Sequence, residues 1–104
     1  MQNALTGKRI LITQATEFMG PTLCTVFAEQ GADVVQSHAD LSAADAVEEV
    51  LRNAGSFDVL VANLSILAPS TPASDVGEAE WKSVFAALVD PLPRLTRAVL
   101  PIFA

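Results

Sequence analysis

The chain has 104 residues, of which 51% are hydrophobic and 17% are charged, and its formal net charge is −6. Its six Lys and Arg residues form no basic patch for a nucleic-acid backbone or an anionic membrane, so we expect neither as a partner. No recognisable signal peptide, no apolar run near the roughly 20 residues of a membrane span, and a single cysteine together predict a cytoplasmic protein.

The first part of the chain predicts a strand, a helix and a second strand. Residues 10–13 form an apolar run of the kind found in buried parallel strands. Pro21 suits the first turn of the following helix and Gly31 suits its end, after which residues 33–37 form the second strand. Because so few residues separate this strand from Asp40, the usual third strand of a doubly wound sheet is absent.

The middle of the chain predicts another helix and a last strand. Ser42 and Asp45 have the spacing of a capping box at the start of the helix, and residues 59–62 form the strand. The alternation predicts an α/β fold, the N-terminal half of a Rossmann-like doubly wound parallel sheet with strand order 2-1-4. Right-handed crossovers then place helices on both faces of the sheet.

The last part of the chain predicts a long helix over residues 78–101, with Asp75 and Glu78 as its N-terminal caps. Apolar residues recur at helical spacing through most of this segment. Two prolines interrupt the segment, and a proline inside a helix loses one hydrogen bond and clashes with the preceding turn. We therefore expect a kink near Leu88.

The turn after the first strand, residues 13–20, stands where a nucleotide-binding α/β protein carries a glycine-rich phosphate loop. A dinucleotide fingerprint needs one glycine for the tight turn and a second so that the backbone can approach the pyrophosphate. Gln14 and Phe18 stand at those two positions, and only Gly20 remains. Because Phe18 has a ring where the cofactor needs empty space, the turn is predicted to bind something smaller than NAD.

This turn reads Thr-x4-Phe-x-Gly, and it resembles the motif that halohydrin dehalogenases carry in place of the glycine motif of their relatives, the short-chain dehydrogenases/reductases. The resemblance extends along most of the chain, over residues 7–13, 31–35, 57–63 and 81–101. The short segment after the second strand, together with Ala62-Asn63 and Asp90-Pro91, is most similar to the B-type branch of the dehalogenases.

The resemblance implies a lyase that converts vicinal haloalcohols to epoxides with release of halide, and that opens epoxides with anions in reverse. It implies no nicotinamide and no metal cofactor, and its partners are a small haloalcohol or epoxide and a halide. In this family a serine and a tyrosine, with an arginine four positions after the tyrosine, perform the reaction. This chain contains no tyrosine. We therefore expect residues 1–104 to be the N-terminal part of a single Rossmann-like domain, inactive on its own.

The halide and substrate pocket is expected between the loops that follow the first and last strands, because ligands of such sheets bind beyond the carboxyl ends of the strands. Thr13 is expected to brace the turn through its hydroxyl, Asn63 to tie neighbouring strands, and Leu64 and Ile66 to form a cavity wall. The residues assigned to the pocket are Thr13, Phe18, Gly20, Asn63, Leu64 and Ile66. No catalytic residue is assigned, and one His with one Cys cannot form a zinc site.

Two alternatives stay open. A divergent NAD(P)-dependent short-chain oxidoreductase is disfavoured by Phe18 and by a second strand that ends without a clear acidic ribose ligand. A non-catalytic interaction module would use its apolar helices to find a partner. The low charged fraction indicates faces that other protein covers. The resemblance implies a homo-oligomer, a tetramer, that forms through the 78–101 helix.

Overall fold

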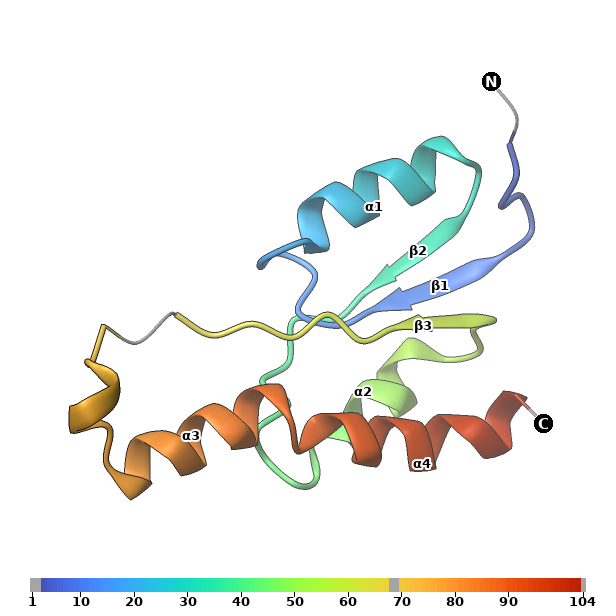
Figure 1. Cartoon of the computed structure of the whole chain (residues 1–104). Coiled ribbons are helices and arrows are strands. Elements are labelled where there is room, and N and C mark those ends of the chain that lie inside the picture. Colours follow the sequence, from blue (N-terminus) through green and yellow to red (C-terminus); the bar gives the residue numbers. More distant parts are fainter. Residues whose placement is uncertain (1–2, 68–69, 104) are drawn as a thin grey trace.

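The computed structural model describes residues 3–67 and 70–103, which form a three-stranded parallel sheet with helices on both faces (Figure 1). The strands are β1 (Arg9–Ile12), β2 (Asp33–Gln36) and β3 (Val59–Val61), in the order β2-β1-β3. The last strand of the chain thus lies beside the first, on the side opposite the second, which confirms the predicted 2-1-4 arrangement and the α/β fold class.

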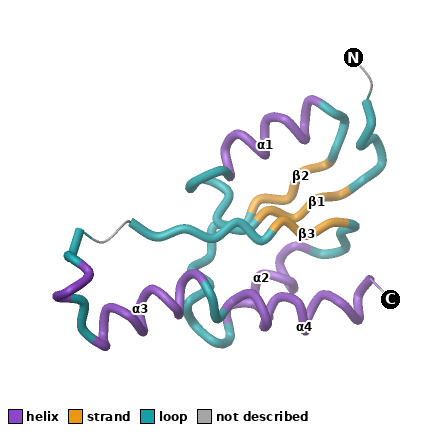
Figure 2. The backbone as a smooth tube through the Cα atoms, viewed as in Figure 1, coloured by secondary structure: helices purple, strands orange, loops and turns teal. Residues whose placement is uncertain are grey.

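The central strand β1 supplies both faces of the sheet, because successive side chains of a strand point to opposite sides. Ile10 and Ile12 pack with Ala15 on the face covered by α1 (Gly20–Glu29), against Leu23 and Phe27. On the other face, Leu11 belongs to a larger buried cluster. The sheet is therefore the middle layer of three, with α1 on one side and the remaining core helices on the other (Figure 2).

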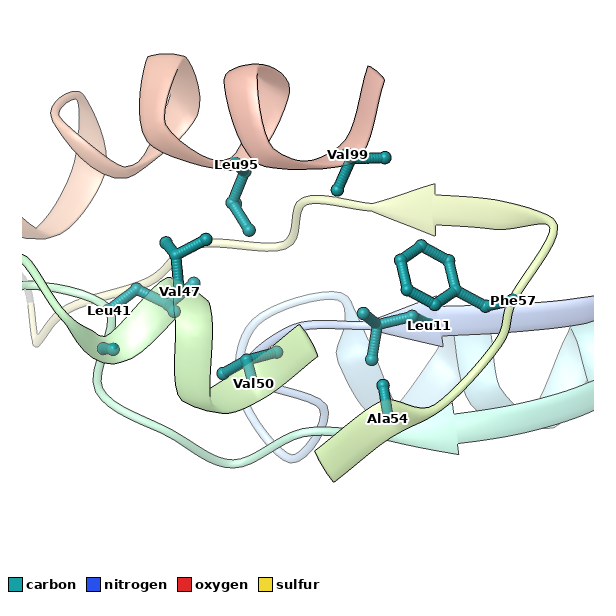
Figure 3. Close-up of a cluster of buried hydrophobic side chains, with 9 residues drawn as sticks. Leu11, Leu41, Val47, Val50, Ala54, Phe57, Leu95 and Val99 are labelled. Atoms are coloured by element: carbon teal, nitrogen blue, oxygen red, sulfur yellow. The ribbon is translucent and has the colours of Figure 1, made fainter. Parts of the chain in front are cut away.

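The larger cluster joins β1 to α2 (Ala46–Ala54) and to α4 (Pro91–Phe103). Figure 3 shows Leu11 beside Phe57 and Ala54 of α2, with Leu95 and Val99 of α4 on the opposite side of the cluster from α2. Leu95 is 1% exposed, and full burial of such a side chain stabilises a fold by roughly 1.5–3 kcal/mol. This cluster fixes α4 on the sheet.

The predicted capping box at the start of α2 is wrong. The helix begins at Ala46, and Asp45 in the N-cap position makes no side-chain capping bond. The backbone N–H of Ser42 instead donates to Oδ1 of Asp40 at 2.9 Å. This turn, closed by an aspartate side chain, competes with helical hydrogen bonding, and it delays the helix by one turn.

The predicted long helix over residues 78–101 is in fact two helices, α3 (Glu78–Leu88) and α4, as Figure 2 shows. The backbone N–H groups of Val89 and Asp90 both donate to the carbonyl of Phe85 at 2.9 Å, which closes α3. Pro91 then occupies the first position of α4, where its missing N–H costs nothing. The expected kink near Leu88 is thus a complete break.

The predicted caps of α3 are also wrong. Gly77 is the N-cap, in extended conformation and without a side-chain capping bond, while Asp75 belongs to the 3-10 helix η1 (Ala73–Asp75). No residue of α3 is buried, and the helix extends beyond the sheet in Figure 1. Among the described residues, no helix has the length and apolarity to cross a bilayer.

The amino end of the sheet is held by Arg9. Its Nε donates to Oδ2 of Asp33 on β2 at 2.9 Å, with both side chains partly exposed. One terminal nitrogen donates to the carbonyl oxygens of Ala54 and Ser56, which close α2 and lead to β3. The Arg9 backbone N–H donates to Oδ2 of Asp58 at 2.8 Å. One residue of β1 thereby bonds to β2, to the end of α2 and to the residue that precedes β3.

Candidate functional site

The turn between β1 and α1 keeps a glycine-like backbone at two positions that carry side chains. Gln14 has φ +43° and Phe18 has φ +50°, and these are the only non-glycine residues with positive φ within residues 3–67 and 70–103. A left-handed conformation costs a non-glycine residue roughly 1–2 kcal/mol. Both positions are those where a dinucleotide fingerprint carries glycine, so other contacts must hold the turn in this shape.

Two buried polar residues hold the turn. The Asn63 side chain is 6% exposed, and its Nδ2 donates to the carbonyl oxygens of Gln14 at 3.0 Å and Glu17 at 2.9 Å. The hydroxyl of Thr13, fully buried, donates to the carbonyl of Asn63 at 2.7 Å. The Thr13 hydroxyl thus bonds to backbone, and its role in bracing the turn stays a prediction. The amide of Asn63 joins the segment after β3 to the turn after β1.

The Gln14 side chain adds a second connection between the same segments. Its Nε2 donates to the carbonyl of Ser65 at 2.9 Å, and its Oε1 accepts a bond from the Ser65 N–H at 3.0 Å. We call this pair of bonds the Gln14 clamp. Nε2 also donates to Oε2 of Glu17 at 2.9 Å, so all of the amide's polar atoms are used. The sequence pattern identifies Gln14 only as a residue in a glycine position, and it does not predict the bonds to Ser65.

Gly20 serves packing at the start of α1. It is buried, and a Cβ at this position would overlap the carbonyl oxygen of Ala15. Its role is therefore the close approach of the helix to the turn, the function of the last glycine in a dinucleotide fingerprint. Gly20 does not line the cavity described next.

A cavity of about 440 Å³ lies between the turn and the segment after β3. Its lining residues are Glu17, Phe18, Ser65, Ile66 and Leu67. The Phe18 side chain is 75% exposed, so little protein covers its ring. Leu64 packs against the larger core cluster instead. Of the six residues assigned to the pocket, Phe18 and Ile66 line this cavity. Thr13 and Asn63 do not line it, but their hydrogen bonds hold the turn that carries Phe18.

A neighbouring crevice of about 400 Å³ crosses the carboxyl ends of the strands. It runs from Gln14 and Ser65 to His38 and Asp40, which follow β2. Hydrogen bonds from the backbone and the side chain of Ser42 lower the pKa of Asp40 below its usual value. This crevice is the position at which open α/β sheets bind ligands.

The described residues contain no group of three or more His, Cys, Asp or Glu side chains arranged to hold a metal ion. Cys24 is a free thiol on α1, packed against the cluster that contains Ile10 and Ile12. Burial raises the pKa of this thiol, which disfavours the reactive thiolate.

The sequence matches no family profile and no curated protein. The structure, in contrast, is similar to solved oxidoreductases. L-sorbose reductase from Gluconobacter frateurii, solved with NADPH and L-sorbose, matches with a TM-score of 0.83 at 20% identity, over 99% of this chain and 50% of the reductase. The 3-ketoacyl-(acyl-carrier-protein) reductase from Brucella melitensis, solved with NADH, matches with a TM-score of 0.83 at 24% identity, over 94% of this chain and 51% of the reductase.

A third match is 2-keto-3-deoxy-D-gluconate dehydrogenase from Streptococcus agalactiae, with a TM-score of 0.73 at 23% identity, over 98% of this chain and 48% of the dehydrogenase. The chain therefore spans about half the length of the structures that it matches. At these identities the likeness establishes the fold, a Rossmann-like α/β half-sheet, and the site must provide the argument for function.

Proposed function

We propose that the chain is the N-terminal half of a cofactor-independent halohydrin dehalogenase, and that the cavity beside Phe18 is its halide pocket. One observation carries the proposal. Phe18 retains the left-handed backbone of a phosphate-loop glycine, yet presents an uncovered aromatic ring to a cavity that Ile66 and Leu67 complete. The strained backbone and the exposed ring both cost free energy, and such costs persist where function requires them.

The chemistry of this cavity suits a small, weakly hydrated anion. The edge of an aromatic ring carries partial positive charge and attracts an anion, and Ile66 and Leu67 add apolar surface beside the ring. In the proposed reaction, the alkoxide oxygen forms a bond to the adjacent carbon as the carbon–halogen bond breaks. The halogen leaves with the electron pair as halide, and the hydroxyl proton goes to a base supplied outside residues 1–104. This chain would stabilise the leaving group.

An NAD(P)-dependent short-chain oxidoreductase is the second candidate. It is favoured by the fold comparison, because the similar structures are reductases and a dehydrogenase, two of them solved with a nicotinamide cofactor. The residues of the turn do not fit the pyrophosphate of that cofactor. The Gln14 clamp joins the turn to Ser65 across the crevice, and Phe18 occupies the position where the backbone would approach the phosphates.

The assembly that we propose is a homo-oligomer, a tetramer, formed through helices α3 and α4. On α3, the ring centroids of Trp81 and Phe85 lie 5.7 Å apart. Trp81 is nevertheless 55% exposed and Phe85 is 44% exposed. Val89, the C-cap residue of α3, and Leu92, near the start of α4, are each 43% exposed. Surfaces of this kind mark contacts with other protein, and a second copy is the partner that the resemblance implies.

Two measurements on the whole protein test the proposed function. The first is halide release from a vicinal bromoalcohol without added nucleotide, followed by an epoxide assay; we expect stoichiometric halide and epoxide. The second is calorimetric titration with NAD(H) and NADP(H); we expect no binding at micromolar concentration. Micromolar nucleotide binding without halide release would contradict the dehalogenase and support the oxidoreductase. If the protein neither binds nucleotide nor releases halide, the result would support the interaction module.

A further inference from the structure

We propose that Gln14 is a positioning residue: its carboxamide fixes the segment 64–67 against the turn and so sets the width of the cavity between Phe18 and Ile66. The clamp itself follows from the geometry of Gln14 and Ser65. Its consequence for halide size rests on the proposed function. Neither the turn motif nor the fold comparison assigns this role, because the residue between Thr13 and Ala15 is a variable position of the Thr-x4-Phe-x-Gly pattern.

The segment that forms the far wall of the cavity has no regular structure of its own. Residues 62–67 lie in neither helix nor strand, and Leu67 is 96% exposed. Ser65 lies near the middle of the wall, and its N–H and carbonyl are both bonded to the Gln14 amide. The amide thus acts on Ser65 as a neighbouring strand would, with one donor and one acceptor in a fixed plane.

The wall is anchored at its other end by Asn63, whose amide is bonded to the turn. Only Leu64 lies between Asn63 and Ser65, and Ile66 directly follows Ser65, so the position of Ile66 depends on the bonds between Ser65 and Gln14. Asn63 is buried and is part of the fold, whereas Gln14 is only half-buried and faces the crevice. Gln14 can therefore be substituted without removing a core residue. A substitution at Gln14 tests the position of the cavity wall without a large loss of stability.

Only a side chain of this length and polarity can make the pair of bonds. Methionine has nearly the same length and volume but can neither donate nor accept comparably. Asparagine has the same amide and tolerates positive φ better, but it is one methylene shorter. Gln14→Met therefore tests the bonds at constant volume. Gln14→Asn keeps the amide and relieves backbone strain but shortens the side chain, so it tests whether the length of glutamine is required.

The experiment uses the whole protein with Gln14→Met, Gln14→Asn and the matched control Gln36→Met, which alters an exposed glutamine at the end of β2. Amide hydrogen exchange at Ser65 reports the clamp, with Leu11 in the central strand as the internal reference. We expect exchange at Ser65 to become about tenfold faster in both Gln14 variants and to stay unchanged in the control. Exchange at Leu11 should stay slow in all of them.

The second measurement is inhibition of haloalcohol conversion by chloride, bromide and iodide. If Gln14 sets the width of the cavity, Gln14→Met should change the ratio of the iodide and chloride inhibition constants by about threefold or more, while Gln36→Met leaves it unchanged. A residue with a merely structural role would weaken binding of all three halides by the same factor.

If the Ser65 amide exchanges at the parent rate in Gln14→Met, the proposal that the Gln14 clamp fixes Ser65 is overturned. Parent-like exchange in Gln14→Asn would overturn the requirement for reach and assign the effect to backbone strain. Faster exchange with an unchanged halide ratio would overturn the positioning role. If the parent protein shows no halide inhibition, the proposed function fails, and exchange at Ser65 together with thermal melting still decides whether Gln14 fixes the segment.

Discussion

The two ends of the sheet are held together by opposite means. At the amino end, Arg9 uses a charged side chain that is 38% exposed, paired with an Asp33 that is 70% exposed. At the carboxyl end, Thr13 and Asn63 use uncharged groups that are almost completely buried. Salt screens an exposed ion pair, which contributes about 0–1 kcal/mol. A buried carbonyl that loses its donor costs about 1–3 kcal/mol.

This difference predicts which end of the sheet tolerates amino-acid substitution. The end that carries the candidate site depends on a few buried amide and hydroxyl bonds, so a substitution that removes one of these bonds should have a large effect. At the opposite end, one partly exposed cation, Arg9, bonds to one carboxylate and two carbonyls. Substitutions at four positions test this contrast, and they follow in order of decreasing expected effect.

Asn63→Ala should have the largest effect on stability. It removes the donor for the carbonyl oxygens of Gln14 and Glu17, and we expect a loss of about 2–4 kcal/mol in the free energy of unfolding. Urea unfolding of the whole protein is the measurement, with Asn53→Ala on the exposed face of α2 as the matched control. The control should stay within about 0.5 kcal/mol of the parent. Equal losses in the two variants would remove the contrast between the ends.

Arg9→Met should cost about 1–2 kcal/mol at low salt, because the bonds to the carbonyls of Ala54 and Ser56 are lost together with the ion pair. The loss should become smaller in high salt, since only the parent has an ion pair to screen. Lys8→Met, an exposed cation beside it, is the matched control. A salt-independent loss would show that the ion pair with Asp33 contributes nothing.

Substitution of Phe18 should have little effect on stability but should weaken halide binding. Phe18→Ala should change the free energy of unfolding by less than about 1 kcal/mol, because the ring is 75% exposed. Phe18→Gly should be more stable than Phe18→Ala by about 1 kcal/mol, since glycine adopts φ +50° without strain. Both should weaken bromide inhibition. Thermal melting and inhibition are measured together, and a loss near 3 kcal/mol with unchanged inhibition would assign Phe18 to the core.

Asp40→Ala should have the smallest effect, and that effect should depend on pH. The lowered pKa of Asp40 in the folded protein means that its contribution is present above the pKa of the unfolded chain, near 3.9. It is lost as the pH falls through the folded pKa. The carboxylate is exposed, so the difference from the parent at pH 7 should be a few tenths of a kcal/mol.

Unfolding measured from pH 7 to pH 2.5 tests the sign of this dependence. The gap between the parent and Asp40→Ala should close as the pH falls below about 4. Asp40→Asn keeps an acceptor for the Ser42 N–H but cannot titrate, so its stability should approach that of the parent without the same pH dependence. A gap that widens in acid would contradict the assigned direction of the pKa shift.

The sequence alone predicts the sheet and most of the turn because both depend on local patterns. Apolar runs and the positions of Pro21 and Gly31 mark the elements, and they follow from backbone preferences that act over a few residues. The start of α2 was missed because Asp40, two residues before Ser42, offers a competing local bond. Propensity does not decide between two local bonds of similar strength.

The candidate site is only partly predictable for a different reason. The bracing role of Thr13 follows from its position at the end of a buried strand. The partner of Gln14 is Ser65, which lies 51 residues further along the chain, and no local pattern encodes that pairing. Leu64 is predicted to form part of the cavity wall, but it packs against the larger core cluster. Sequence reasoning therefore locates the site but does not determine the contacts across it.

The close approach of Gly20 to Ala15 has a consequence for mutational tolerance and for library design. Any side chain at residue 20 must push α1 away from the turn, because the obstructing atom belongs to the backbone. The side chains of Glu17, Phe18 and Met19 are exposed, although the positive φ at residue 18 disfavours β-branched residues there. A saturation scan of the turn should thus show a permissive stretch that ends abruptly at one invariant position. Libraries that aim to reshape the cavity should diversify residues 16–19 and leave residue 20 as glycine.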